Sequence, residues 1–177
     1  MVQIPGVEGE KTYFVQRWGI NGYQIGALAA TPIYAIAALR RGGFSIRSFA
    51  RYNWVVPLLG AAGASGGAHA LTANESAATT ASRTLEMRAD AEKVKQDDMH
   101  LIGSVVGALL TPALFLRRVG LVNGLLGGAG IGSAGGILTY MFQKEGVEGV
   151  EKRGKEVLEE GKKLAEDARQ KALDVKK

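Results

Sequence analysis

Few residues in this sequence could do acid–base, nucleophilic or metal chemistry. The chain has no cysteine, which excludes disulfides, thiolate metal ligands and a cysteine nucleophile. His69 and His100 are its two histidines, so we expect no histidine-based metal cluster. No Ser-His-Asp grouping can be built at a defined spacing, and the phosphate-loop pattern GxxxxGKS/T is absent. We therefore expect a protein that is not an enzyme and that holds no metal or cofactor.

Glycine is the residue that shows a pattern. It recurs at every fourth position of an uncharged, largely apolar stretch from 120 to 142, at Gly120, Gly124, Gly128, Gly132 and Gly136. Each interior glycine costs a helix in water about 1 kcal/mol relative to alanine. A segment inside a bilayer must nevertheless be helical or part of a closed barrel, and glycines on one helix face let a neighbouring backbone approach closely. The stretch therefore predicts a membrane helix; a flexible glycine-rich loop is the alternative.

Three further apolar runs have about the 20 residues that a membrane helix requires. With the glycine-rich stretch they give four predicted spans, at about 19–39, 54–73, 99–116 and 119–142. The run at 54–73 is the least apolar, because alanine and glycine replace leucine and isoleucine. Glycine pairs at the same spacing of four predict further packing faces, at Gly22, Gly26, Gly63, Gly67, Gly103 and Gly107.

The remaining segments are polar. Residues 1–18 form a mixed N-terminal segment, and a short helix is expected at about 80–95 between the second and third spans. Residues 143–177 form a charged tail with a thin apolar stripe. This tail either lies along a partner or a membrane surface, or is an exposed helix. The predicted fold is thus an all-α membrane protein with four transmembrane helices packed through glycine-rich faces, plus a charged C-terminal helix.

Arginines gather where the predicted helices end. The connection 40–53 carries four arginines and no acid, and two more end the third run: Arg40, Arg41, Arg47, Arg51, Arg117 and Arg118. We interpret them as anchors for phospholipid headgroups, with an RNA-binding patch as the alternative for 40–53. The positive-inside rule places both short connections in the basic-favoured compartment and both termini on the other side.

The start of the sequence does not resemble a cleaved targeting segment. It lacks the basic, apolar and small-residue order of a secretory signal, and Glu8 and Glu10 are atypical of a mitochondrial presequence. We expect any organelle targeting information to be internal.

Residues 96–108, QDDMHLIGSVVGA, resemble the start of the third helix in the preprotein-and-amino-acid-transporter family. Four glycine-rich helices and an arginine-rich first connection resemble the same family over about 19–142. The family includes the channels of the mitochondrial inner-membrane protein translocases and a four-helix accessory subunit of respiratory complex I. The second run lacks the acidic residue of that family's second helix, which favours a structural role over transport.

The resemblance implies a multi-pass protein of the mitochondrial inner membrane, with its termini toward the intermembrane space. The leading hypothesis is a non-catalytic accessory subunit of complex I that supports assembly and stability of the membrane arm. The alternatives are a translocase subunit and an unrelated organelle membrane protein. The expected partners are subunits of a large membrane complex and membrane phospholipid, such as cardiolipin. No nucleic acid and no small-molecule substrate are expected.

Overall fold

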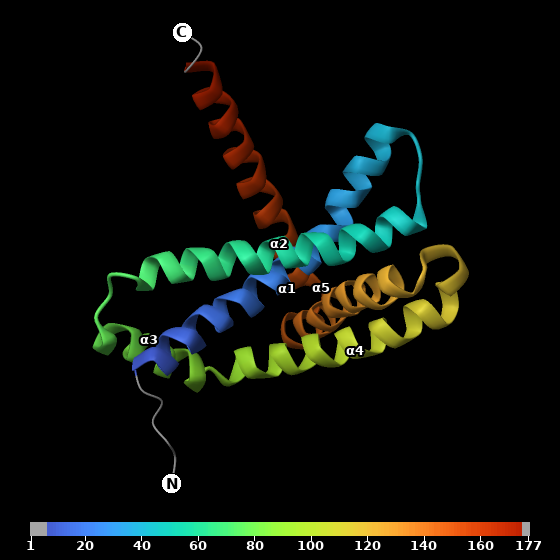
Figure 1. Cartoon of the computed structure of the whole chain (residues 1–177). Helices are drawn as coiled ribbons and strands as arrows, with labels where there is room; N and C mark the ends of the chain where they lie inside the picture. The colour runs from blue at the N-terminus through green and yellow to red at the C-terminus, as the bar shows by residue number, and fades with distance from the viewer. Residues whose placement is uncertain (1–6, 175–177) are drawn as a thin grey trace. The chain divides into compact units, whose positions relative to one another are not determined.

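The structure is a computed structural model that describes residues 7–174 and is helical over nearly all of them (Figure 1). No strand occurs in this range, so the all-α prediction is confirmed. The helices in the described range are α1 (Val7–Arg41), α2 (Ile46–Thr72), α3 (Ala77–Ala89), α4 (Ala91–Val119) and α5 (Leu121–Asp174). The chain divides into two compact units, Met1–Ile137 and Leu138–Lys177.

Several element boundaries differ from the prediction. The basic connection 40–53 is mostly helix, because Ser45 caps α2 by accepting a hydrogen bond from the backbone N–H of Ser48 (3.4 Å). Arg47 and Arg51 therefore lie in the first turns of α2. The helix expected at 80–95 is two helices, since the Asp90 side chain accepts from the N–H groups of Glu92 and Lys93 at 3.1 Å and starts α4 there. The segment 1–18 is helical from Val7 onward.

Length and composition identify a membrane protein. Within the described residues, three helical segments are long and apolar enough to cross a membrane: Gly9–Arg41, Ala91–Val119 and Leu121–Lys144. Helix α2, which covers the predicted span 54–73 up to Thr72, is not among them. The four-span arrangement therefore stays a prediction.

The first unit contains two antiparallel helix pairs. Gly22 of α1 faces Gly60 of α2, and Gly26 faces Pro57. Residue numbers therefore rise along α1 while those of the facing residues in α2 fall, so the two helices are antiparallel. The α4–α5 pair behaves in the same way. Gly103 faces Gly132 and Gly107 faces Gly128 across a turn at Gly120, whose positive φ of 81° suits glycine. The short turn predicted between the third and fourth runs is confirmed.

The relative chain direction of the two helix pairs follows from hydrogen bonds between α1 and α4. Lys93 and Gln96 of α4 bond Asn21 and Gln24 of α1 with the same sequence offset, so α1 and α4 run parallel. The turn at residues 42–45 and the turn at Gly120 therefore lie at one end of this unit, and α3 lies at the other (Figure 1).

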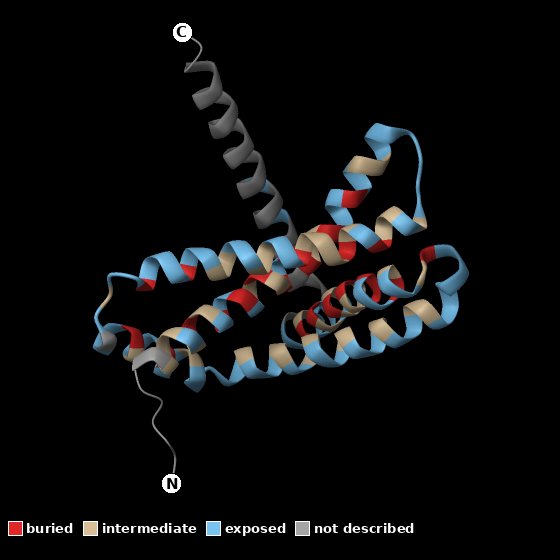
Figure 2. Ribbon diagram, in the orientation of Figure 1, coloured by how far each residue is buried: buried red, intermediate tan, exposed pale blue. Residues whose placement is uncertain are grey.

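Several small residues of this unit are buried, whereas α4 is exposed or half-buried over most of its length (Figure 2). Ala27 and Ala30 have no exposed surface, whereas Leu101, Leu109 and Leu114 of α4 are 61%, 65% and 71% exposed. An outward apolar surface of this kind suits lipid rather than water.

The second unit consists of the end of α5. Its helix is interrupted at Gly146, where φ is 69°, and continues to Asp174. The predicted C-terminal helix is confirmed for the backbone. The partner expected for its apolar stripe remains a prediction, because most of its side chains lie outside the described residues.

Candidate functional site

A cluster of polar side chains joins α1 to the N-terminal half of α4. Arg17 and Asp97 form an ion pair, and the Gln24 amide donates to the second carboxylate oxygen of Asp97 (2.7 Å). Gln96 donates to the oxygen of Gln24 (2.9 Å), and the Lys93 ammonium lies 3.4 Å from the amide oxygen of Asn21. Arg17, Asn21 and Gln24 are spaced by four and three residues, which places them on one face of α1.

This polar cluster is largely withdrawn from solvent. The side chain of Arg17 is 9% exposed and that of Asp97 is 21% exposed, while Gln24 is 2% exposed. Within the described part of the chain, Nη2 of Arg17 is buried without a hydrogen-bond partner. An ion pair in such surroundings fixes two helices to each other, because separating its charges leaves one of them buried and unpaired.

A Ser–His contact lies one helical turn further along α4. Nδ1 of His100 lies 2.5 Å from Oγ of Ser133 in α5, and the imidazole ring packs edge-on against Tyr23. Ser133 has no exposed surface, and the carboxylate of Asp97 is held by Arg17 and Gln24. The contact therefore lacks both the access and the orienting acid of a nucleophilic triad, and it serves to join α4 to α5.

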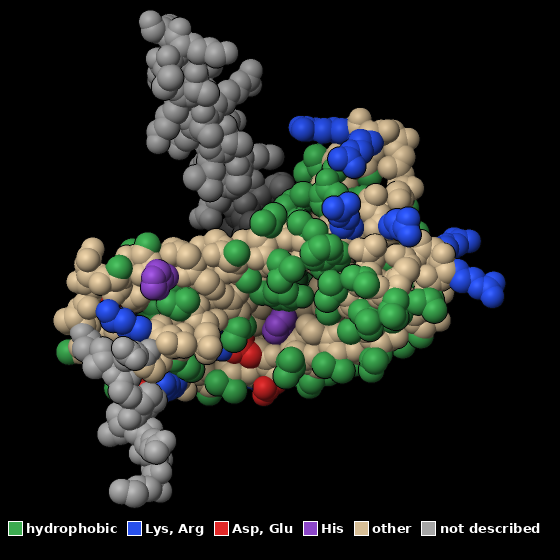
Figure 3. All heavy atoms as spheres, viewed as in Figure 1, with side chains coloured by type: hydrophobic (Ala, Val, Ile, Leu, Met, Phe, Trp, Pro, Cys, Tyr) green, Lys and Arg blue, Asp and Glu red, His purple; other side chains and the backbone are tan. Residues whose placement is uncertain are grey.

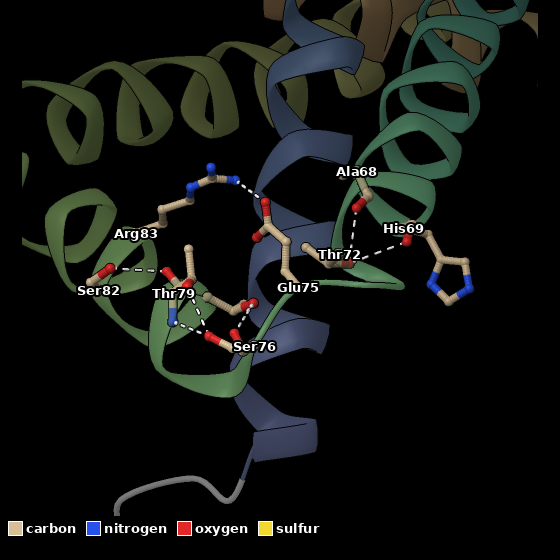
Figure 4. Close-up of polar contacts among 9 residues, drawn as sticks. Ala68, His69, Thr72, Glu75, Ser76, Thr79, Ser82 and Arg83 are labelled. Carbon is tan, nitrogen blue, oxygen red and sulfur yellow. Dashed lines mark hydrogen bonds and ion pairs between the residues drawn. The ribbon is translucent and has the colours of Figure 1, made fainter.

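Helix α3 is held to α1 by a second set of polar contacts. Glu10 pairs with Arg88 (3.3 Å) and accepts a hydrogen bond from the buried hydroxyl of Thr84. The Arg88 guanidinium lies 4.3 Å from the centre of the Tyr13 ring. Glu75, which follows α2, pairs with Arg83 of α3 at 2.7 Å, as Figure 4 shows.

The structure places the predicted glycines in two groups. At eight of them an added Cβ would meet another helix closely: Gly22, Gly26, Gly103, Gly107, Gly124, Gly128, Gly132 and Gly136. The same test finds open space within 4 Å, among the described residues, at Gly63, Gly67 and Gly120. Gly120 ends α4 through its N–H bond to the Leu116 carbonyl (2.9 Å), so it belongs to the turn rather than to the packing face.

Among the residues outside the predicted faces of glycines spaced by four, two glycines and one asparagine are also closely packed. Gly127 and Gly130 of α5 lie against the backbone of Ala50 and Asn53 in α2, which joins the two helix pairs. Asn53 has no exposed surface and donates to the Phe49 carbonyl (2.9 Å). Gly127 and Gly130 are three residues apart and do not belong to the row of glycines spaced by four.

All six predicted arginine anchors are exposed and lie at the end of the first unit that carries the two tight turns. Figure 3 shows Lys and Arg side chains gathered at this end. Phe44, which is 70% exposed, lies beside them. The arrangement suits binding to anionic headgroups, and this role stays a prediction.

No group of three or more His, Cys, Asp or Glu side chains that could hold a metal ion occurs among the described residues. Comparison with protein-family models, with curated proteins and with solved structures finds no match to this chain. The functional inference therefore depends on the geometry of the chain and on its sequence patterns.

Proposed function

We propose that this chain is a non-catalytic accessory membrane subunit of mitochondrial respiratory complex I, which supports the assembly and stability of the membrane arm. The observation that carries the proposal is a glycine face on α2 that nothing in the described chain covers. Gly63, Gly66 and Gly67 lie on this face, and a Cβ added at any of them would meet no atom within 4 Å.

This uncovered face differs from the glycine faces that the chain uses internally. Gly22 and Gly26 meet α2, and Gly103 and Gly107 meet α5, in each case at backbone distance. Interior glycines without such a contact lower helix stability by about 1 kcal/mol each. A close-packed helix from another subunit would offset that cost, since small residues in membrane helices allow backbones to approach.

The polar side chains inside the first unit support a structural role. Arg17, Gln24 and Asp97 bond one another, and His100 bonds Ser133, so these groups hold helices together. The large apolar side chains of α4 face outward, as expected for a helix that contacts lipid or apolar neighbours.

A translocase subunit is the second candidate. It is favoured by a buried arginine, a buried glutamine and a partly buried aspartate beside apolar helices, because ionisable residues at such positions often mark a transport path. The Nη2 group of Arg17, which has no partner in the described chain, could bind part of a passing segment. A transport role would make Arg17 essential for flux, whereas a structural role requires it for stability.

The α2 face can be tested with a double variant, Gly63→Leu/Gly67→Leu, and a matched control, Ala113→Leu. Ala113 is also exposed but belongs to α4, outside the glycine face of α2. We expect the double variant to keep the helicity and stability of the purified chain and to be lost from the large membrane complex on native gels. The control should assemble normally. Normal assembly of the double variant would show that this face binds no partner helix.

A further inference from the structure

A cleft of about 490 Å³ lies between the first turns of α1 and the last turns of α2. Polar side chains of both helices line it, among them Lys11, Thr12, Gln16, His69 and Thr72. It lies at the end of the first unit opposite the two tight turns, and so away from the arginines discussed above.

The cleft lies beside a part of α1 that has no glycine, residues 11–16. The two helices are at backbone distance at Gly26 and Gly22, and Gly19 lies against the Ser65 side chain. From Gln16 back to Lys11 the α1 side has no glycine, and side chains of ordinary size hold the helices apart. The space that results is within the range of natural ligand sites, about 300–1,000 Å³.

The side chains that line the cleft are rich in hydrogen-bond donors. Lys11 supplies an ammonium group, Gln16 an amide and His69 an imidazole, and the described residues of the lining include no carboxylate. The hydroxyl of Thr72 donates to the Ala68 carbonyl (2.9 Å), which leaves its oxygen as an acceptor. Figure 4 shows the His69 ring projecting from the last turn of α2, away from Glu75. Such a lining suits an anionic group with several oxygen acceptors, and lysine is a common binder of phosphate.

The position of the cleft indicates which kind of molecule would carry the anionic group. Trp18 lies within one turn of Gln16 on α1 and is 39% exposed, as is typical of a side chain at the membrane–water interface. Val15 and Ala73 add apolar surface to the cleft. We propose that this cleft binds the phosphate of a phospholipid headgroup. The proposal depends on the membrane placement of the chain and is independent of the host complex.

The test uses the full chain in phosphatidylcholine vesicles that contain a minor fraction of photoactivatable phosphatidylglycerol. Cross-linked peptides are then mapped by mass spectrometry. The wild-type chain should be labelled in the peptides that contain Lys11–Gln16 and His69–Ala73. Labelling there should fall about tenfold in Lys11→Gln/His69→Gln, the factor expected for the loss of one charge-assisted hydrogen bond. Ala73→Trp, which fills the cleft without changing charge, should have the same effect.

Lys95→Gln removes an exposed cation of α4 outside the cleft and should leave the labelling unchanged. Equal labelling of the cleft in all variants would overturn the proposal. Lower stability of the Lys11→Gln/His69→Gln variant with unchanged labelling would also overturn it, because these side chains would then serve only the last carbonyls of α2. Complete competition by free glycerol phosphate would assign the cleft to a soluble phosphate ester and would contradict a lipid site.

Discussion

At the scale of single residues, the ion pair between Arg17 and Asp97 is a contact whose removal is expected to be costly, because Arg17 is nearly buried. Arg17 is nearly buried, and Asp97 also accepts from Gln24 at 2.7 Å. A buried ion pair adds little to folding stability when compared with a well-packed apolar pair. Removing one partner is nevertheless destabilising, because it leaves the other charge buried and unpaired. The pair therefore fixes the register of α4 on α1.

We predict that Asp97→Asn lowers the free energy of unfolding by about 3 kcal/mol, the lower end of the range for a broken buried pair, because Asp97 is partly exposed. The measurement is denaturant unfolding of the purified chain in detergent micelles. Asp98→Asn changes the neighbouring exposed carboxylate and should alter stability by about 0.5 kcal/mol or less. Similar effects of the two substitutions would show that the ion pair contributes nothing to stability.

The sequence gives a signal for one partner of this pair and none for the other. Asp97 belongs to the segment that resembles a family motif, which makes it a candidate for a structural or functional role. No pattern in the sequence indicates Arg17, because its partner is 80 positions away and the pairing depends on the packing of α1 against α4. Periodicity within one helix shows which residues share a face, but it does not show which helix that face contacts.

At the scale of elements, glycine spacing predicted which faces allow close approach but not which faces are used. Gly103 and Gly107 pack against α5, whereas Gly63 and Gly67 have the same spacing and face open space within the described chain. The ends of the helices were harder to predict. Ser45 and Asp90 start helices inside stretches that composition alone had assigned to a loop and to a single helix.

Replacement of glycine by alanine should have opposite effects at a glycine packed against another helix and at a glycine that faces open space. Gly107→Ala would place a Cβ closer than 3.0 Å to backbone atoms of Gly128 and Gly132, so it should destabilise the purified chain by about 1–3 kcal/mol through overpacking. Gly63→Ala has open space and should leave stability unchanged or raise it by about 1 kcal/mol through helix propensity. Thermal unfolding in detergent, followed by circular dichroism, measures both. Equal loss of stability in the two variants would contradict the packing assignment.

At the scale of the whole molecule, the first unit has chemically different ends. The exposed arginines lie with the two tight turns, and the polar contacts of α3 lie at the opposite end. Parallel α1 and α4 bring the two basic turns together, as the positive-inside rule requires if both connections occupy one compartment. Charge along the sequence predicted this asymmetry, while the number of membrane spans and the host complex remain predictions.

The proposed role is tested most directly by separating mild-detergent mitochondrial membranes on a native gel and locating this chain by mass spectrometry. An accessory subunit of complex I should migrate with the NADH-oxidising complex, and depletion of the chain should lower the amount of that assembled complex. Migration with the protein-import machinery would contradict this role and support the translocase candidate. Migration as an isolated chain would contradict membership in either complex.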